Sequence, residues 1–339
     1  MTSSKLLVAI LLVAALASPF SNPQLNAYEA VEPHMGTLFR IKLYAENQTV
    51  AQHAFRAAFD RVDQLERILS DYRAESELSL ITAEAVGRPV RVSEDLFRVA
   101  EASQQISAET EGAFDLTIGP LTHLWRQARH NQTLPQKQAI QAAMVHCGYQ
   151  KLHLDRAART IEFDMPQMLL DAGGIAKGYA ADEALAVLGG LGLRSALVAA
   201  SGDLAFGDAP PGKSGWEIGV DSFDRANKPF TRVLTLSNAG VSTSGSSEQH
   251  LNSGGSTYSH IIDPTTGLGL QADLTVTTIS RRGITADAAA TAISVLGCER
   301  GLVFANQHPD LAAYLLFKTQ GQVREFESDR FERILTAGR

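Results

Sequence analysis

The spacing of apolar side chains predicts that the chain opens with a strand followed by a long helix. Residues 38–45 alternate Phe39, Ile41 and Leu43 with polar neighbours, which is typical of a strand with one buried face. Residues 51–70 repeat apolar side chains every three or four positions, which predicts an amphipathic helix. The segment before the strand contains Pro, Asn and Ser and is interpreted as a linker.

The rest of the pattern mixes strands and helices without regular alternation. Ser93 is placed as the N-cap of a helix that runs to about Thr110, and another helix starts near Tyr179. A run of small residues at 241–247 ends one of the strand patterns. Other expected elements are helices at 121–129 and 286–296, helical character in 130–150, a hairpin in 151–163, and strands at 196–200, 216–220, 233–236, 274–280 and 315–318. We predict one α+β domain over residues 31–339, with a mixed, largely antiparallel core sheet and flanking helices.

Composition and net charge restrict which partners the protein is expected to bind. The chain has 339 residues, of which 45% are hydrophobic and 20% charged, as in ordinary globular proteins. The net charge of −7 argues against a broad nucleic-acid-binding surface, so no nucleic acid is expected as a partner. Cys147 and Cys298 have no metal-ligand spacing and are expected to be free thiols, although an oxidising compartment would allow them to pair.

The N-terminus carries a targeting pattern. Lys5 precedes an apolar run at 6–17 that is short for a bilayer span, and Ala15-Leu16-Ala17 fits the small-x-small cleavage rule. We predict a signal peptide at 1–17, with a linker to about residue 30, and export to the periplasm. A retained anchor on the periplasmic side of the inner membrane is the alternative. No Cys directly follows the run, so a lipoprotein is not expected.

Residues 169–188 are the stretch most suggestive of chemistry. Asp171 precedes Gly173-Gly174, and Lys177 stands just before the predicted helix. Glycines permit close ligand approach, and a helix N-terminus beside a lysine favours phosphate. The alternative is a structural strand–turn–helix corner, because the stretch matches neither the Walker loop nor the G-x-G-x-x-G turn.

Two further stretches contain candidate catalytic and metal-binding groups. His260, at the end of a predicted strand, is a candidate general base, since histidine titrates near neutral pH; a structural role is the alternative. Asp287 and Thr291 are four residues apart, so their oxygens share one helix face that suits Mg²⁺. The alternative here is that Thr285 or Asp287 caps the helix.

Eight motifs in order give the chain a family resemblance. They read M-G-T at 35–37, L-S-x-Y-R at 69–73, A-F-D-x-T-x-G-P-L at 113–121, D-x-G-G-I-A-K-G-Y-A-x-D at 171–182, S-G-D at 201–203, S-T-S-G at 242–245, H-I-I-D-P-x-T-G at 260–267, and A-D-A-x-A-T at 286–291. This set resembles the ApbE family, the FAD:protein FMN transferases, over about residues 35–296.

The resemblance implies an enzyme that cleaves FAD and attaches FMN, through its phosphate, to a threonine of an acceptor protein with release of AMP. Mg²⁺ is the implied cofactor, FAD the substrate, and His260 and Asp287 the catalytic residues. The implied metal ligands are Asp287, Thr291 and the carbonyl of Gly174, of which Gly174 is the position that varies in the family. The implied FAD-binding residues are Met35, Tyr72, Ala113, Phe114, Asp115, Asp171, Lys177 and Ile262. The implied acceptors are flavin-carrying subunits of membrane redox complexes or other exported FMN-binding proteins.

Two other functions fit the same residues. The protein would be an FAD pyrophosphatase if water replaced the threonine, releasing FMN and AMP. It would be an exported flavin-binding protein if it bound FAD without cleaving it. The Asp287/Thr291 pair argues against pure storage, because a passive binder has no need of a metal.

Overall fold

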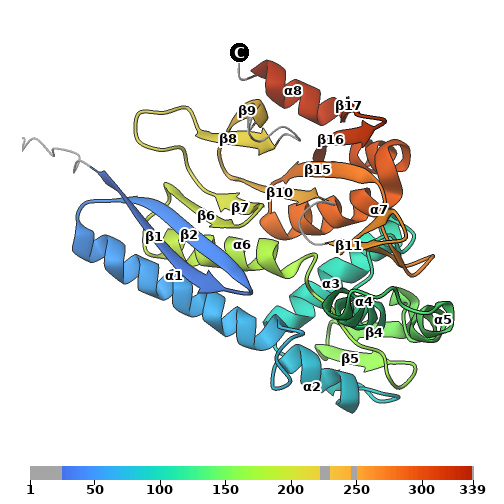
Figure 1. Cartoon of the computed structure of the whole chain (residues 1–339). Helices are drawn as coiled ribbons and strands as arrows, with labels where there is room; N and C mark the ends of the chain where they lie inside the picture. The colour runs from blue at the N-terminus through green and yellow to red at the C-terminus, as the bar shows by residue number, and fades with distance from the viewer. Residues whose placement is uncertain (1–24, 222–229, 246–249, 338–339) are drawn as a thin grey trace, which may run out of the picture.

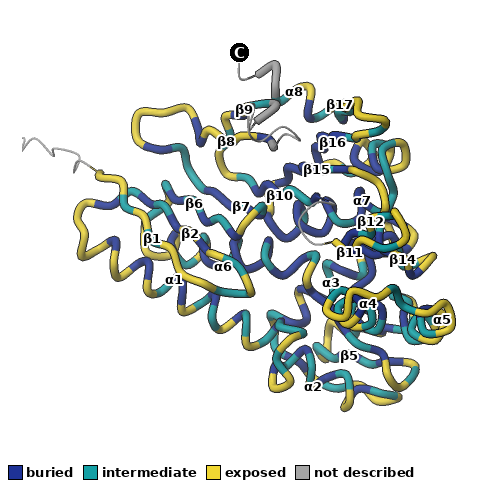
Figure 2. The backbone as a smooth tube through the Cα atoms, in the orientation of Figure 1, coloured by how far each residue is buried: buried dark blue, intermediate teal, exposed yellow. Residues whose placement is uncertain are grey.

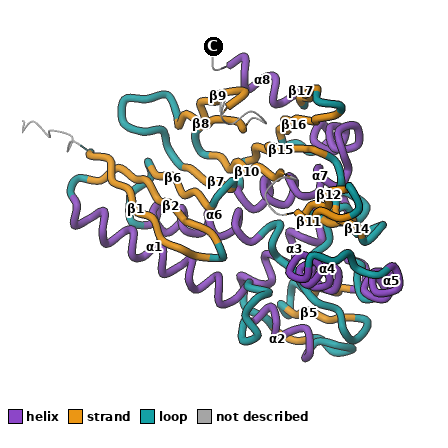
Figure 3. Tube along the Cα trace, in the orientation of Figure 1, coloured by secondary structure: helices purple, strands orange, loops and turns teal. Residues whose placement is uncertain are grey.

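An eight-stranded sheet forms the centre of the protein (Figures 1 and 3). The computed structural model describes residues 25–221, 230–245 and 250–337. The strand order is β1-β2-β6-β7-β10-β15-β16-β17, and every neighbouring pair is antiparallel. The bounds are β1 Asn26–His34, β2 Thr37–Ala45, β6 Ala196–Ala200, β7 Asp203–Phe206, β10 Ala239–Gly245, β15 Asp273–Ser280, β16 Ala312–Thr319 and β17 Gln322–Glu327. The α+β prediction with a largely antiparallel core sheet is confirmed.

Helices surround this sheet and a smaller lobe adjoins it. The helices are α1 Gln48–Leu69, α2 Glu77–Glu84, α3 Glu94–Glu109, α4 Gly119–Asn131, α5 Lys137–Val145, α6 Ala176–Gly190, α7 Gly283–Gln307 and α8 Asp329–Ala337. The short strands are β3 Val90–Arg91, β4 Leu152–Asp155, β5 Thr160–Phe163, β8 Trp216–Asp221, β9 Phe230–Leu236, β11 His250–Ser253, β12 Ser256–Ser259, β13 Ile262–Asp263 and β14 Leu268–Gly269. Helices α2, α4 and α5 gather with β4 and β5 at the lower right of Figure 1.

The sheet is covered on both faces. Alternate residues of β16 divide between two hydrophobic clusters, with Ala313 and Leu315 in the larger and Tyr314 and Leu316 in the smaller. The larger cluster includes residues of α1, α6 and α7, and the smaller one includes residues of β8, β9 and α8. Figure 2 shows α7 and the central strands as mostly buried, whereas the edge strand β1 is largely exposed. Long apolar stretches such as α7 are therefore explained by burial on the sheet.

Glycines let α6 and α7 cross with their backbones almost in contact. A β-carbon at Gly283 would lie 2.7 Å from the carbonyl oxygen of Gly178, and one at Gly178 would lie 2.7 Å from the β-carbon of Asp287. Gly240 of β10 packs equally closely against the start of α7. Residues with side chains would push these elements apart, so the glycines determine how near α6 and α7 approach.

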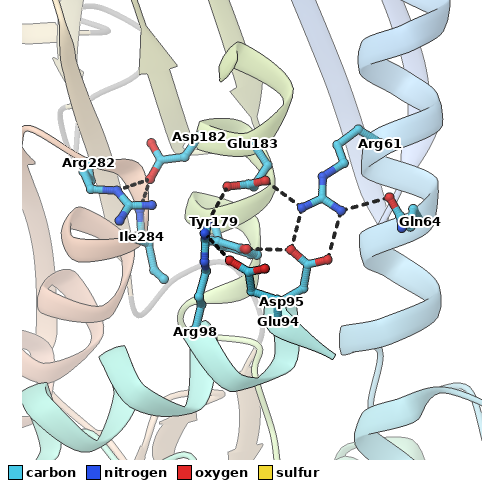
Figure 4. Close-up of polar contacts among 10 residues, drawn as sticks. All are labelled: Arg61, Gln64, Glu94, Asp95, Arg98, Tyr179, Asp182, Glu183, Arg282 and Ile284. Atoms are coloured by element: carbon cyan, nitrogen blue, oxygen red, sulfur yellow. Dashed lines mark hydrogen bonds and ion pairs between the residues drawn. The ribbon is translucent and has the colours of Figure 1, made fainter. Parts of the chain in front are cut away.

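An ion network fixes the other side of α6 (Figure 4). Arg61 of α1 donates to Asp95 of α3 at 2.9 Å and to Glu183 of α6 at 2.6 Å. The Tyr179 hydroxyl, in the second turn of α6, donates to the same Asp95 at 2.6 Å. Burial opposes ionisation of Asp95, but the hydrogen bonds from Arg61 and Tyr179 hold its pKa below its usual value. The network ties three helices together and orients α6.

Most elements expected from the sequence are present. The strand at 196–200 coincides with β6, and the Ser93 hydroxyl accepts from the Leu96 N–H at 3.2 Å as an N-cap. The hairpin in 151–163 is β4–β5, and the two cysteines are free thiols. The predicted signal peptide at 1–17 lies outside the described residues.

Three expectations and one alternative were wrong. The segment read as a linker forms β1 from Asn26 onward, paired along its whole length with β2. The run at 241–245 is a central strand, β10, rather than the end of one; 246–247 lie outside the described residues. Helix α6 begins at Ala176, so Lys177 lies in its first turn. Neither Thr285 nor Asp287 caps α7, because the Asp182 carboxylate of α6 accepts from the N–H groups of Gly283 and Ile284 at 2.7 and 3.1 Å.

Candidate active site

A cavity of about 280 Å³ brings the predicted site residues together. Its wall is built from the β1–β2 turn, the loop after α1, the loop before α4 and α4 itself, the turn before α6 and the start of α6, the end of β10, the β12–β13 bend and α7. All the residues predicted for the site line it: Met35, Tyr72, Ala113, Phe114, Asp115, Asp171, Gly174, Lys177, His260, Ile262, Asp287 and Thr291. Segments more than 200 residues apart in sequence meet here, which is what a shared functional site requires.

The start of α6 presents positive charge to the cavity. Lys177 forms an ion pair with Asp203, whose other oxygen accepts from the Ser242 hydroxyl at 2.6 Å. The preceding turn is held by Asp171, whose Oδ1 accepts from the Gly173 N–H at 2.8 Å. The N-terminus of α6 adds its dipole to the ammonium group, so this wall suits an anionic phosphate.

Asp287 and Thr291 of α7 lie against the same turn. A β-carbon at Gly174 would come 2.8 Å from the Thr291 hydroxyl oxygen, so only glycine lets the turn approach α7 this closely. Asp287 is 2% exposed, and its Oδ2 accepts from the Gly178 N–H at 2.9 Å. Burial, and then the neighbouring Asp203, raise the pKa of Asp287 to about 7, with Lys177 acting in the opposite direction.

These features fit a magnesium ion. The buried Asp287 carboxylate has too little positive charge around it to ionise readily, and a divalent cation would correct that. The donors at hand are a carboxylate, a hydroxyl and a backbone carbonyl, which are the oxygen ligands that Mg²⁺ prefers. Within the described ranges no cluster of three or more His, Cys, Asp or Glu side chains could hold a metal by itself. Part of the coordination shell would therefore come from substrate phosphate and water, as is usual for magnesium.

His260 is held at the bend between β12 and β13. The backbone around it is anchored on α4, where Trp125 donates from Nε1 to the carbonyl of Gly267 at 2.8 Å and packs on the ring of Tyr258 at 5.5 Å between centroids. The Asp263 carboxylate closes the following turn by accepting from the N–H and the hydroxyl of Thr265. A cavity-lining imidazole on such a braced turn can accept a proton at a defined place.

Two turns supply the apolar part of the wall. Met35 and Gly36 form the two-residue loop between β1 and β2, with φ of 49° and 71°, so the hairpin tip delivers Met35 to the cavity. Phe114 lies against Gly174, whose β-carbon would meet its ring at 3.3 Å. Asp115 lines the cavity, but its Oδ1 is engaged by the N–H and hydroxyl of Thr117, which shapes this loop.

The sequence did not indicate that two arginines of α4 line the cavity. Arg126 of α4 pairs with Asp71 and, at 2.9 Å, with Asp171, and its Cζ lies 4.1 Å from the ring centroid of Tyr72. Arg129, one turn later, lines the cavity as well. The i, i+3 spacing of the two arginines was visible, but nothing in the sequence indicated which side of that helix faces the site. Thr122, Thr243 and Ser244 were also missed as lining residues.

A comparison with protein families decides the assignment. Residues 35–315 match the model of the ApbE family. The chain belongs to the ApbE family. Among curated relatives, a Treponema pallidum protein named FAD:protein FMN transferase is 30% identical over 91% of this chain and 90% of its own length. A Vibrio cholerae protein of the same name is 28% identical over 97% of this chain and 98% of its own length.

Solved structures agree with the family assignment. The flavin transferase ApbE of Vibrio cholerae has a TM-score of 0.80 and 26% identity, covering 92% of this chain and 100% of that one. The Pseudomonas stutzeri flavinyl transferase ApbE, in its apo form, has a TM-score of 0.81 and 28% identity, covering 93% of this chain and 98% of that one. This ApbE-family chain therefore shares its fold with flavin transferases along nearly its entire described length.

Proposed function

We propose that this protein is an FAD:protein FMN transferase, which moves FMN from FAD to an acceptor protein. The observation that carries the proposal is that one cavity contains a helix N-terminus with Lys177, the oxygen donors of Asp287 and Thr291, and a braced His260. These groups suit cleavage of a phosphoanhydride, which needs positioning and charge neutralisation more than covalent help from the protein. The names of the relatives support flavin as the group transferred.

The chain's own residues orient and neutralise the pyrophosphate. Lys177 and the α6 N-terminus attract its oxygens, and the glycine turn at 173–174 lets them approach the backbone. Asp287, Thr291 and the Gly174 carbonyl would hold Mg²⁺, which when bound neutralises charge that develops on the phosphate oxygens. Lys177 is itself held by Asp203, so its charge is kept at a fixed place.

His260 is proposed as the base for the acceptor threonine. It takes the proton from the hydroxyl as that oxygen bonds to the FMN phosphorus. The bond from this phosphorus to the bridging oxygen breaks, and AMP leaves with that oxygen. The product is FMN joined to threonine through a phosphoester, and the proton gained by His260 passes to solvent.

The acceptor and the site of action follow from the same proposal. We expect the acceptors to be flavin-carrying subunits of membrane redox complexes or other exported FMN-binding proteins. Export is supported by Lys5, the apolar run at 6–17 and Ala15-Leu16-Ala17. N-terminal sequencing of the native protein should begin near Ser18, and a cytosolic chain that keeps Met1 would contradict export.

Mass measurement of an acceptor tests the transferase proposal. The protein is incubated with FAD, Mg²⁺ and a threonine-containing acceptor, beside a Thr→Val acceptor. The expected product is an acceptor heavier by one FMN less one water, with an equal amount of AMP, and an unmodified Thr→Val control. AMP and free FMN with no labelled acceptor would mean hydrolysis, and tight FAD binding without AMP would mean storage.

A further inference from the structure

Arg129 is a cation in the cavity wall that the proposed mechanism leaves without a role. It lies on α4 one turn after Arg126. Arg126 is neutralised by Asp71 and Asp171, whereas Arg129 forms no ion pair with any residue in the described part of the chain. Its Nη1 is covered from solvent and donates no hydrogen bond within that part. Burial also lowers the pKa of its guanidinium. A half-buried cation whose N–H donors lack partners is unfavourable unless a ligand accepts hydrogen bonds from them.

The ring of Tyr72, which contacts Arg126, offers a surface on which a flat ligand ring can stack. Tyr72 is 75% exposed, and Arg126 lies over its ring with Cζ 4.1 Å from the centroid. This cation–π contact and the Asp71 ion pair hold the loop that carries Tyr72 in place. An aromatic ligand can stack on an amphipathic ring held in this way.

Arg129 belongs to a different part of the wall from the phosphate-binding groups. Lys177, Gly174 and Asp287 lie where α6 meets α7. Helix α4 reaches the glycine turn through Arg126, which pairs with Asp171 at 2.9 Å, and Arg129 lies one turn further along α4, which packs on α5 and β11. The pyrophosphate of FAD is already assigned to the region of Lys177, Gly174 and Asp287. The group that reaches Arg129 is therefore expected to be one of the two ring systems of FAD.

The hydrogen-bonding edges of the two rings differ. Guanidinium presents parallel N–H donors and no acceptor. The isoalloxazine ring has two pairs of adjacent acceptors, O2 beside N1 and O4 beside N5, which match that fork. On adenine the N6 amino donor stands beside the N7 acceptor, so a guanidinium fork would place a donor against a donor. The chemistry favours the flavin.

We propose that Arg129 is a specificity-determining residue that donates to an acceptor edge of the isoalloxazine ring stacked near Tyr72. The inference rests on the proposed function, since it takes FAD to be the substrate. It explains why α4 carries a second arginine beside one that is already neutralised. It also predicts that Arg129 favours the reduced flavin, because the negative charge of the reduced ring gathers at N1 and O2.

Binding of two fragments of FAD tests the proposal. FMN carries the flavin without adenosine, and ADP carries the adenosine half without flavin. Arg129→Met keeps the aliphatic stem and should weaken FMN binding roughly ten- to a hundredfold, the usual range for a hydrogen bond to a charged group, while ADP binding changes less than about twofold. Arg129→Lys should lie between. The midpoint potential of bound FMN should become more negative in Arg129→Met.

Matched controls separate this from damage to the fold. Gln127→Met places the same side chain on an exposed position of α4 outside the cavity and should leave both affinities unchanged. Unchanged FMN affinity and potential in Arg129→Met, or equal losses for FMN and ADP, would overturn the inference. If Arg129→Met does not fold, the same readings are taken from Arg129→Lys. Parent protein that binds neither FMN nor FAD would instead overturn the proposed function.

Discussion

Replacing Asp287 by asparagine separates the role of its charge from the role of its shape. Asparagine keeps an oxygen that can accept the Gly178 N–H, now 2.9 Å from Asp287 Oδ2. It removes the negative charge that burial and Asp203 disfavour. If the Asp287 carboxylate is a ligand of Mg²⁺, the substitution should stabilise the metal-free protein and impair FMN transfer.

The stabilisation can be sized from the pKa of Asp287. A rise from 3.8 to about 7 corresponds to a penalty of roughly 4 kcal/mol for the ionised form at pH 8, at about 1.4 kcal/mol per unit. That penalty already includes the attraction of Lys177. The buried amide of asparagine brings N–H donors that lack partners at this place, which offsets part of the gain, so we expect the free energy of unfolding to increase by about 1–3 kcal/mol and Tm by several degrees. Because the folded-state pKa lies above the unfolded one, the penalty grows as pH rises from about 4 to about 7, and the gain should shrink at pH 5.

Transfer should respond in the opposite direction. Loss of metal neutralisation is worth several kcal/mol at the transition state, so the rate of acceptor labelling should fall by about a hundredfold or more. The rise in Tm that Mg²⁺ causes in the parent should also disappear. Asp60→Asn, an exposed change on α1, is the control and should alter none of these quantities. A variant that transfers FMN at the parent rate under limiting Mg²⁺, or that is less stable without metal, would refute the assignment.

Three more changes test other parts of the site. His260→Ala should slow threonine labelling by about a hundred- to ten-thousandfold, while calorimetry still detects Mg²⁺ binding with FAD. Gly178→Ala should lower the free energy of unfolding in urea by about 1–3 kcal/mol, because its β-carbon would lie 2.7 Å from that of Asp287; wild-type stability would contradict the tight crossing. Burial, and then Asp171, raise the pKa of Asp71 to about 6, so its contribution to stability should fall as pH rises from about 4 to about 6. Denaturation of Asp71→Asn at pH 4.5 and 7 should show a smaller fall than the parent, and an equal fall would reject the assignment.

Local patterns were enough for most elements of the fold. The alternation of Phe39, Ile41 and Leu43 and the Ser93 cap are read correctly from neighbours in sequence, because their causes are local. The run at 241–245 was misread, since Gly240 and small neighbours resemble a loop. It forms a central strand because it pairs with β7 on one side and β15 on the other, and Gly240 at its start lets α7 pack closely there.

The motifs predicted a set of site residues, and all of them line one cavity. Sequence could not show what each is doing, because those roles depend on contacts between distant segments. For Asp287 the sequence left a helix cap open beside the metal-ligand reading, and only the folded chain shows that Asp182 caps α7 and that Asp287 accepts from the Gly178 N–H of α6. Arg126 and Arg129 differ only by three positions on one helix, yet the tertiary structure neutralises the first and leaves the second facing a cavity. Charge and burial at a site are set by which elements pack together, and for these residues only the folded chain decides that.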